Sequence, residues 1–371
     1  MFDPRMTELA KGLVNYSVAA KAGDKVLIEA TDVPAEFTAE LVRQVYAVGA
    51  YPFVETYRGK VEAAVRAGTS DEHSKMLADF AAYRMEKMDC YIGVRGNENA
   101  YDLSGVPSDK AALYGRNYSY PVHHEMRVKN TRWVVLRWPN DSMAQLSGEP
   151  TDAFEDFYFR VCCMDYAKMD RAMDALKALM DKTDKVRLVA KDTDLTFSIK
   201  GIGAVKCSGH MNIPDGEVYS APVKDSVNGK ITYNVPSIEN GTKFENVSLT
   251  FERGRIVSAT GNYPDRINAI SDTDEGARYV GEFAIGVNPY VTKAMGDILF
   301  DEKIAGSIHF TPGCCYDDAY NGNQSAVHWD LVLVMTPEFG GGEIWFDDVL
   351  VRKDGLFVLP ELECLNPENL K

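Results

Sequence analysis

The first half of the chain alternates between two patterns of hydrophobic residues. Apolar positions three and four residues apart predict helices, and short uninterrupted apolar runs predict strands covered on both faces. Helices are expected at residues 3–20, 31–48 and 61–87, with one or two more over residues 152–182, and strands at residues 25–30, 51–57, 90–94 and 132–137. Strands that alternate with crossover helices form a parallel sheet. We therefore expect an α/β N-terminal domain with a parallel sheet over residues 1–180.

After about residue 184 the pattern changes to short strands that follow one another with turn residues between them. Strands are expected at residues 186–190, 195–199, 230–233, 247–251, 255–259, 331–335, 343–346 and 349–353, and helices near residues 274–280 and 290–300. Successive strands joined by tight turns pair antiparallel. We therefore expect an α+β C-terminal domain with mostly antiparallel strands over residues 181–371, with the boundary between about residues 170 and 185.

The charge balance restricts the partners. Asp and Glu total 55 against 40 Lys and Arg, which gives a formal net charge of −15. A field of this sign repels nucleic acid and anionic membrane surfaces, and it tolerates a substrate with a positive amine. The longest strongly apolar run, residues 331–335, is too short to cross a bilayer, and residues 1–5 lack the apolar stretch of a secretory signal. Seven cysteines without zinc-site spacing indicate free thiols in a reducing cytoplasm.

Two histidines lie in apolar, strand-like surroundings. His328 and Asp330 are two residues apart at the start of the apolar run 330–335, so their side chains emerge on one face of a strand. A buried Asp is costly unless it is paired or binds a metal ion. His309 lies in a second apolar run, residues 306–310. Each residue alone is more often structural, and together they make a metal site and a structural role equally weighted alternatives.

Carboxylates complete the candidate set. Glu282 runs directly into an apolar stretch, and Glu217 follows a loop rich in Pro and Gly that enters a strand. Two histidines and three carboxylates suit two divalent ions (zinc, cobalt or manganese) better than one structural zinc. Either Glu282 or Asp330 is the expected shared ligand between the two ions.

These segments resemble the thermophilic aminopeptidase family of metallopeptidases, often called the aminopeptidase T family. The resemblance extends over nearly the whole chain. The matching segments are residues 22–29, 48–53, 212–222, 274–282 and 299–302, His309 with Tyr316 seven residues later, and residues 328–330.

The resemblance implies a two-metal exopeptidase that removes residues from peptides with a free N-terminus and that forms a homodimer. By position it implies a set of five metal ligands, namely Glu217, Glu282, His309, His328 and Asp330. It also implies that Tyr316 is a catalytic residue, and the chemistry of carbonyl hydrolysis offers its hydroxyl the role of donating to the developing oxyanion. Two stretches depart from the family pattern: residues 312–315, which end in two adjacent cysteines, and residues 101–128, which leave the substrate preference open.

Several alternatives remain open. Beside the aminopeptidase, two functions stay possible: another metal-dependent amidase, or a catalytically silent peptide- or metal-binding protein on the same scaffold. Cys314 or Cys315 as a thiol nucleophile is less favoured than a packing role, because nothing nearby marks a lowered pKa. The general base is unassigned, with Glu275, Asp317 and Asp318 as candidates.

Overall fold

The computed structural model describes residues 3–99, 101–239 and 242–371. The chain divides into two compact units, Met1–Cys163 with Gly209–Pro214, and Met164–Ser208 with Asp215–Lys371. This division differs from the expected boundary at 180/181, because helix α8 (Tyr166–Met180) belongs to the second unit. Lys206 ties that helix to strand β7 (Val205–Cys207) through ion pairs with Asp170 and Asp174.

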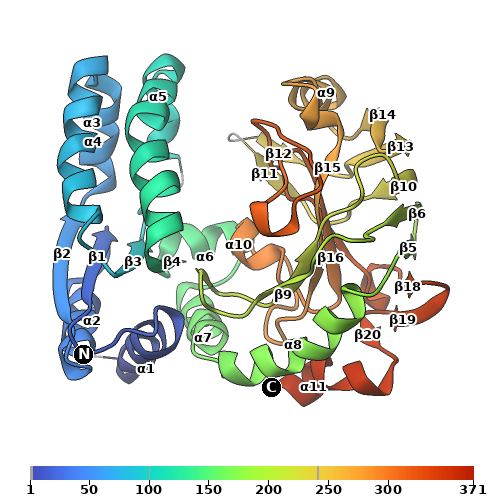
Figure 1. Ribbon diagram of the computed structural model, residues 1–371, viewed down its shortest axis with the longest axis horizontal. Helices are drawn as coiled ribbons and strands as arrows, with labels where there is room; N and C mark the ends of the chain where they lie inside the picture. Colours follow the sequence, from blue (N-terminus) through green and yellow to red (C-terminus); the bar gives the residue numbers. More distant parts are fainter. Residues whose placement is uncertain (1–2, 100, 240–241) are drawn as a thin grey trace. The chain divides into compact units, whose positions relative to one another are not determined.

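The first unit contains the expected parallel sheet, with strand order β2-β1-β3-β4-β8 and every pair parallel. The strands are β1 (Lys25–Thr31), β2 (Tyr51–Tyr57), β3 (Cys90–Arg95), β4 (Arg132–Arg137) and β8 (Asn212–Ile213). The helices, most of them labelled in Figure 1, are α1 (Pro4–Gly12), α2 (Ala35–Ala47), α3 (Gly59–Gly68), α4 (Asp71–Met85), α5 (Ser108–Tyr114), α6 (Asp141–Ser147) and α7 (Thr151–Cys162), and a π-helix, η3, spans Gly115–Val128. The α/β prediction for this half is confirmed.

The second unit is built on antiparallel sheets, as predicted for the second half. One sheet has the order β14-β13-β10-β6-β5-β18-β19-β20, a second has the order β17-β16-β15-β9-β7, and β11 pairs with β12. The strands of the first sheet are β5 (Lys185–Ala190), β6 (Thr193–Ser198), β10 (Asn228–Thr232), β13 (Ser248–Glu252), β14 (Arg255–Thr260), β18 (Gly342–Phe346), β19 (Val349–Lys353) and β20 (Leu356–Phe357). The others are β9 (Glu217–Ser220), β11 (Ser237–Glu239), β12 (Thr242–Phe244), β15 (Val280–Gly286), β16 (Ser307–Pro312) and β17 (Val332–Val334).

Several predicted helices were wrong in extent. The helix expected at 61–87 is two helices, because the Ser70 side chain accepts a hydrogen bond from the His73 amide and starts α4 anew. Residues 274–280 form only a 3-10 turn, Gly276–Arg278, and residues 290–300 form only the start of α10 (Ile298–Asp301), which Asp297 caps. Helices α9 (Pro264–Ser271) and α11 (Pro367–Leu370) were not predicted. Among the described residues, none of the helices combines the length and the apolar character that a membrane crossing requires.

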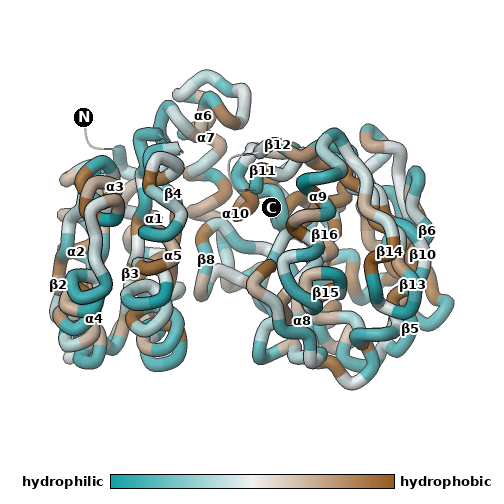
Figure 2. The backbone as a smooth tube through the Cα atoms, turned by 90° about the horizontal axis from the view of Figure 1, so that it is seen from above, coloured by the Kyte–Doolittle hydropathy of each residue, from teal (hydrophilic) through white to brown (hydrophobic). Residues whose placement is uncertain are grey.

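An aromatic core joins the two large sheets of the second unit. The ring of Phe197 on β6 lies 4.9 Å from that of Phe283 on β15 and 5.0 Å from that of Phe310 on β16. All three residues are buried. In the five-stranded sheet, Phe283 pairs with Phe310, whereas the adjacent Glu282 and His309 point to the opposite face. Figure 2 shows that hydrophobic and hydrophilic stretches both occur among the strands of this unit. The five-stranded sheet therefore has one apolar face against this core, and its other face is free to carry polar groups.

Strand β15 is irregular directly before Glu282. The pairing with β16 shifts between Val280 and Glu282, which leaves Gly281 as an extra residue. A Cβ atom at Gly281 would lie 2.1 Å from the backbone oxygen of Cys314, closer than any van der Waals contact allows. Only glycine therefore permits this approach of two backbones, which determines the direction of the Glu282 side chain.

We predict that Gly281→Ala lowers the free energy of unfolding by about 3 kcal/mol, the upper range for overpacking, because the neighbouring atoms are backbone and cannot rotate away. Gly203→Ala is the matched control, since the nearest atom to its Cβ would be 3.9 Å away. Urea denaturation followed by circular dichroism measures both. Equal stability of the two variants would contradict the steric argument.

Candidate metal centre

The register of the five-stranded sheet brings the predicted ligands together. Ala284 pairs with His309 and Glu282 pairs with Thr311, while Gly286 pairs with Glu217 on the opposite neighbour. Paired residues and residues two apart share a face of a sheet. Glu217, Glu282 and His309 therefore project from the face opposite to the aromatic core, which we call the polar face.

His328 and Asp330 reach the same place from the segment before β17. A bridge pairs His328 with Gly313, just after β16, and the Thr311 hydroxyl on β16 donates a 2.7 Å hydrogen bond to Asp330 Oδ1. All five predicted ligands therefore converge in space, although they are separated by up to 113 residues in sequence. Glu217, Glu282 and His309 are buried, and the side chains of His328 and Asp330 are only slightly exposed.

Glu282 lies between the two imidazoles. Its Oε1 is 3.1 Å from His309 Nε2, and its Oε2 is 3.2 Å from His328 Nε2. On the outer sides, His309 Nε2 is 3.4 Å from Glu217 Oε2, and His328 Nε2 is 3.3 Å from Asp330 Oδ1. One carboxylate thus faces both histidines, and each histidine has a further carboxylate of its own.

The hydrogen bonding of His328 indicates which of its ring nitrogens is available to bind a metal ion. Its Nδ1 lies 2.8 Å from the carbonyl oxygen of Cys314. A carbonyl only accepts, so Nδ1 carries a proton in either charge state of the ring, and Nε2 is the nitrogen that offers a lone pair once its own proton is displaced. That lone pair faces carboxylate oxygens, which are also acceptors. His328 Nε2 and Glu217 Oε2 are accordingly among the buried atoms that lack a hydrogen-bond partner in the described structure. Donor atoms of this kind fit a divalent ion placed between them.

The charges in the cluster also indicate a site that suits divalent ions. Burial would lower the pKa of His309, but the neighbouring Glu217 and Glu282 raise it to about 10. Burial would also raise the pKa of Asp330, but the charge of His328 holds it well below its ordinary value. Without an ion, the imidazoles are therefore held protonated by the carboxylates. Metal ions that bind here displace those protons.

The structure adds residues that the sequence did not single out as ligands. Glu302, at the end of α10, offers an oxygen within 4.8 Å of ligand atoms of Glu217 and His309. Lys303 is almost completely buried, and its Nζ lies 2.6 Å from both Glu217 Oε1 and Glu302 Oε1. Glu302 closes the segment 299–302 that carried the family resemblance, and this was the available signal. Nothing in the sequence indicates that Lys303 points inward.

The other candidates are placed as follows. The Tyr316 ring lies 4.8 Å from the His328 ring and is 47% exposed, so it covers an open edge of the site. Asp317 and Asp318 are exposed, and Asp318 accepts a hydrogen bond from Tyr219. Glu275 belongs to the turn before β15.

The adjacent cysteines take part through packing and backbone. Cys315 is buried, and its thiol contacts the backbone oxygen of Asn323. Cys314 contributes its carbonyl group to His328. Both are free cysteines. These contacts agree with the packing role and offer no support for a thiol nucleophile.

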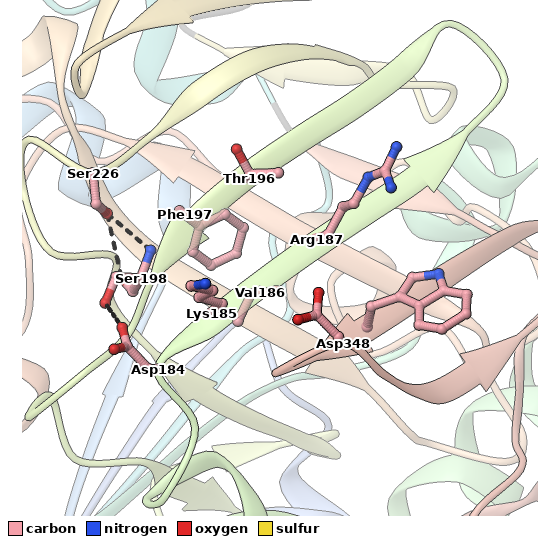
Figure 3. A pocket seen from close by; sticks show the side chains of 10 residues that line it. Asp184, Lys185, Val186, Arg187, Thr196, Phe197, Ser198, Ser226 and Asp348 are labelled. Atoms are coloured by element: carbon pink, nitrogen blue, oxygen red, sulfur yellow. Dashed lines mark hydrogen bonds between the residues drawn. The ribbon is translucent and has the colours of Figure 1, made fainter.

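A separate pocket lies on the eight-stranded sheet. It has a volume of about 510 Å³ and is lined by side chains that include Phe197, Arg187, Trp345 and Asp348. Figure 3 shows Ser226, Ser198 and Asp184 hydrogen-bonded in a row at one end. None of the five predicted ligands lines this pocket, so it is distinct from the candidate metal centre.

Comparison with known proteins identifies the family. The family model described as thermophilic metalloprotease (M29) matches residues 2–339. The chain belongs to this family. Aminopeptidase AmpS of Bacillus subtilis is 34% identical over 159 residues, an alignment that covers 38% of each chain. Aminopeptidase PepS of Streptococcus thermophilus is 22% identical over 90% of this chain and 92% of its own.

Solved structures confirm the fold. AmpT from Thermus thermophilus superposes with a TM-score of 0.77 at 22% identity, covering 97% of this chain and 100% of its own. A 2,5-dihydroxypyridine dioxygenase from Pseudomonas putida superposes with a TM-score of 0.64 at 13% identity, covering 96% and 98%. Proteins with different named activities therefore share this architecture, and the function has to be argued from the site.

We predict that Glu282→Gln and Asp330→Asn each weaken zinc binding at least about 100-fold, because each loses an anionic ligand while its size is kept, and even outer-shell changes reach that range. Asp317→Asn, an exposed acid on the adjoining segment, is the control and should bind as the wild type does. Zinc content after dialysis against a graded chelator series is the measurement. Full zinc retention by Glu282→Gln would exclude that carboxylate as a ligand.

Proposed function

We propose that the protein is an aminopeptidase that uses two divalent ions to release amino acids from the N-terminus of peptides. The observation that carries the proposal is the position of Glu282 between two imidazoles, each with a further carboxylate beside it. Membership of the M29 family and the aminopeptidase names of the aligned relatives support it. Zinc, cobalt and manganese all suit this mixture of imidazole and carboxylate donors.

The residues divide into two groups around a shared carboxylate. His309 and Glu217 would hold one ion, His328 and Asp330 the other, and Glu282 both. When bound, such a pair polarises a carbonyl and lowers the pKa of water. Thr311 keeps Asp330 in position through its hydroxyl.

Two further residues have roles in the reaction. One accepts the proton of the attacking water, and the other stabilises the negative charge that develops on the scissile carbonyl. Glu302 has one oxygen held by Lys303, and its other oxygen takes the proton of the attacking water. The Tyr316 hydroxyl, beside His328, donates to the oxyanion that forms at the scissile carbonyl. The surplus of carboxylates and the net charge of −15 favour a substrate amine over a blocked terminus.

The setting of the enzyme also belongs to this proposal. We place it in the cytoplasm, supported by seven free cysteines, and as a homodimer, supported only by the family resemblance. A different metal-dependent amidase and a silent binding protein are the alternatives. Release of p-nitroaniline from leucine and arginine p-nitroanilides, its loss with EDTA and its recovery with cobalt or zinc distinguish the peptidase from both. Bound metal without turnover of any aminoacyl substrate would favour the binding protein.

We expect a peptide with a free N-terminus to be shortened one residue at a time and its N-acetylated counterpart to stay intact. The physical reason is that the acidic site binds an amine and offers no compensation for burying an acetyl group. Mass spectrometry of matched peptide pairs over time is the measurement. Internal cleavage of the acetylated peptide at a comparable rate would contradict the proposed specificity.

We expect Tyr316→Phe to lower kcat by about 10²–10³, the cost of removing one oxyanion donor, with little change in KM. Both metals and the fold should be retained, because only a hydroxyl is deleted. Tyr320→Phe is the control, as an exposed tyrosine four residues away. The measurement is steady-state kinetics, with metal analysis of the same samples. Loss of metal from Tyr316→Phe would make the tyrosine a ligand or its support, and an unchanged kcat would reduce it to lining the pocket.

A further inference from the structure

Lys303 is a buried cation beside the candidate metal centre. It is 1% exposed and forms ion pairs with Glu217 and Glu302, each at 2.6 Å. A third carboxylate, Asp215, lies 3.6 Å from the same Nζ. A buried ammonium group requires paired anions to offset its lost hydration, and three carboxylates supply them here. The pairing therefore keeps a fixed positive charge within the donor cluster.

The two halves of the centre differ in their relation to this charge. Lys303 occupies Oε1 of Glu217, which leaves Oε2, the atom that faces His309 Nε2 at 3.4 Å. The half formed by His328 and Asp330 makes no ion pair with Lys303 among the described contacts, and a neutral hydroxyl supports Asp330 instead. An ion at the Glu217 half therefore shares its carboxylates, Glu217 and Glu302, with an ammonium group and has that like charge nearby.

We propose that the Lys303 ammonium acts as a permanent internal cation that makes the two metal positions unequal, so that the Glu217–His309 position binds its ion more weakly than the His328–Asp330 position. This inference rests on the proposed two-metal function and specifies how the two sites are filled. The physical cause is repulsion between the ammonium group and a dication that share Glu217 as partner. At low metal supply the chain carries one ion, and the second ion binds only as the free concentration rises.

A purely structural role for Lys303 predicts the opposite change in metal affinity when the residue is replaced. If the ammonium only held Glu217 in place, its removal would loosen that ligand and weaken the metal. If its charge opposes the ion, its removal strengthens binding at one position. The direction of the change therefore separates the two roles.

The experiment is a titration of metal-free full-length protein with Co²⁺, followed by calorimetry and by the visible absorption of bound cobalt. For the wild type we expect two binding steps, the second at least about tenfold weaker than the first. Lys303→Gln should tighten the second step about tenfold and leave the first within threefold. Lys303→Arg retains the charge and should keep the two steps unequal. Circular dichroism of each metal-free variant verifies folding.

The outcomes are distinct. Two equal steps in the wild type overturn the inference and leave the two-metal function standing, and this reading does not depend on either variant folding. A weaker second step in Lys303→Gln assigns Lys303 a positioning role and also overturns the inference. No bound cobalt in the wild type overturns the proposed function together with the inference. Unequal steps that converge in Lys303→Gln but not in Lys303→Arg support it.

Discussion

Repulsion between the carboxylates on the polar face of β9 and β15 is the force that the surrounding residues have to offset. Unpaired buried carboxylates cannot stay ionised in a protein interior. In this structure the carboxylates contact one ammonium group at Glu217, two imidazoles around Glu282 and a hydroxyl at Asp330. These groups balance the charge only in part, and the described structure leaves Glu217 Oε2, His309 Nδ1 and His328 Nε2 without a hydrogen-bond partner.

The apolar face of the same sheet offsets the unfavourable free energy of placing these carboxylates close together. Phe283 alternates with Glu282 on β15, and Phe310 alternates with His309 on β16, so each polar group has an aromatic neighbour anchored in the core. Burial of each such side chain stabilises the fold by about 1.5–3 kcal/mol. This stabilisation offsets the cost of burying the charged groups on the other face. The close packing also fixes the strand register, and a shift of one residue would turn the ligands into the core.

The sequence revealed the fold classes and the five converging residues because each carries a local signal. His328 and Asp330 share a strand face by spacing alone, and Glu282 stands out as an acid that enters an apolar run. Lys303 had no such local signal, and Glu302 was indicated only by the segment 299–302 of the family resemblance, because a charged pair at the end of a short helix normally lies in solvent. Their inward direction depends on the turn after α10, which is a tertiary effect. The helices near 274–280 and 290–300 were overestimated because Asp274 binds Ser325 and Ala326, which are distant in sequence, and Asp301 accepts hydrogen bonds from two amides that a continuous helix would have used.

The bond between His328 Nδ1 and the carbonyl group of Cys314 makes a backbone segment part of the candidate centre. A partner of this kind fixes the orientation and the tautomer of a histidine ligand. The same carbonyl oxygen is the atom that a Cβ at Gly281 would meet. The glycine before Glu282 and the ring of His328 therefore depend on one peptide group, and a displacement of that group would disturb both halves of the centre at once.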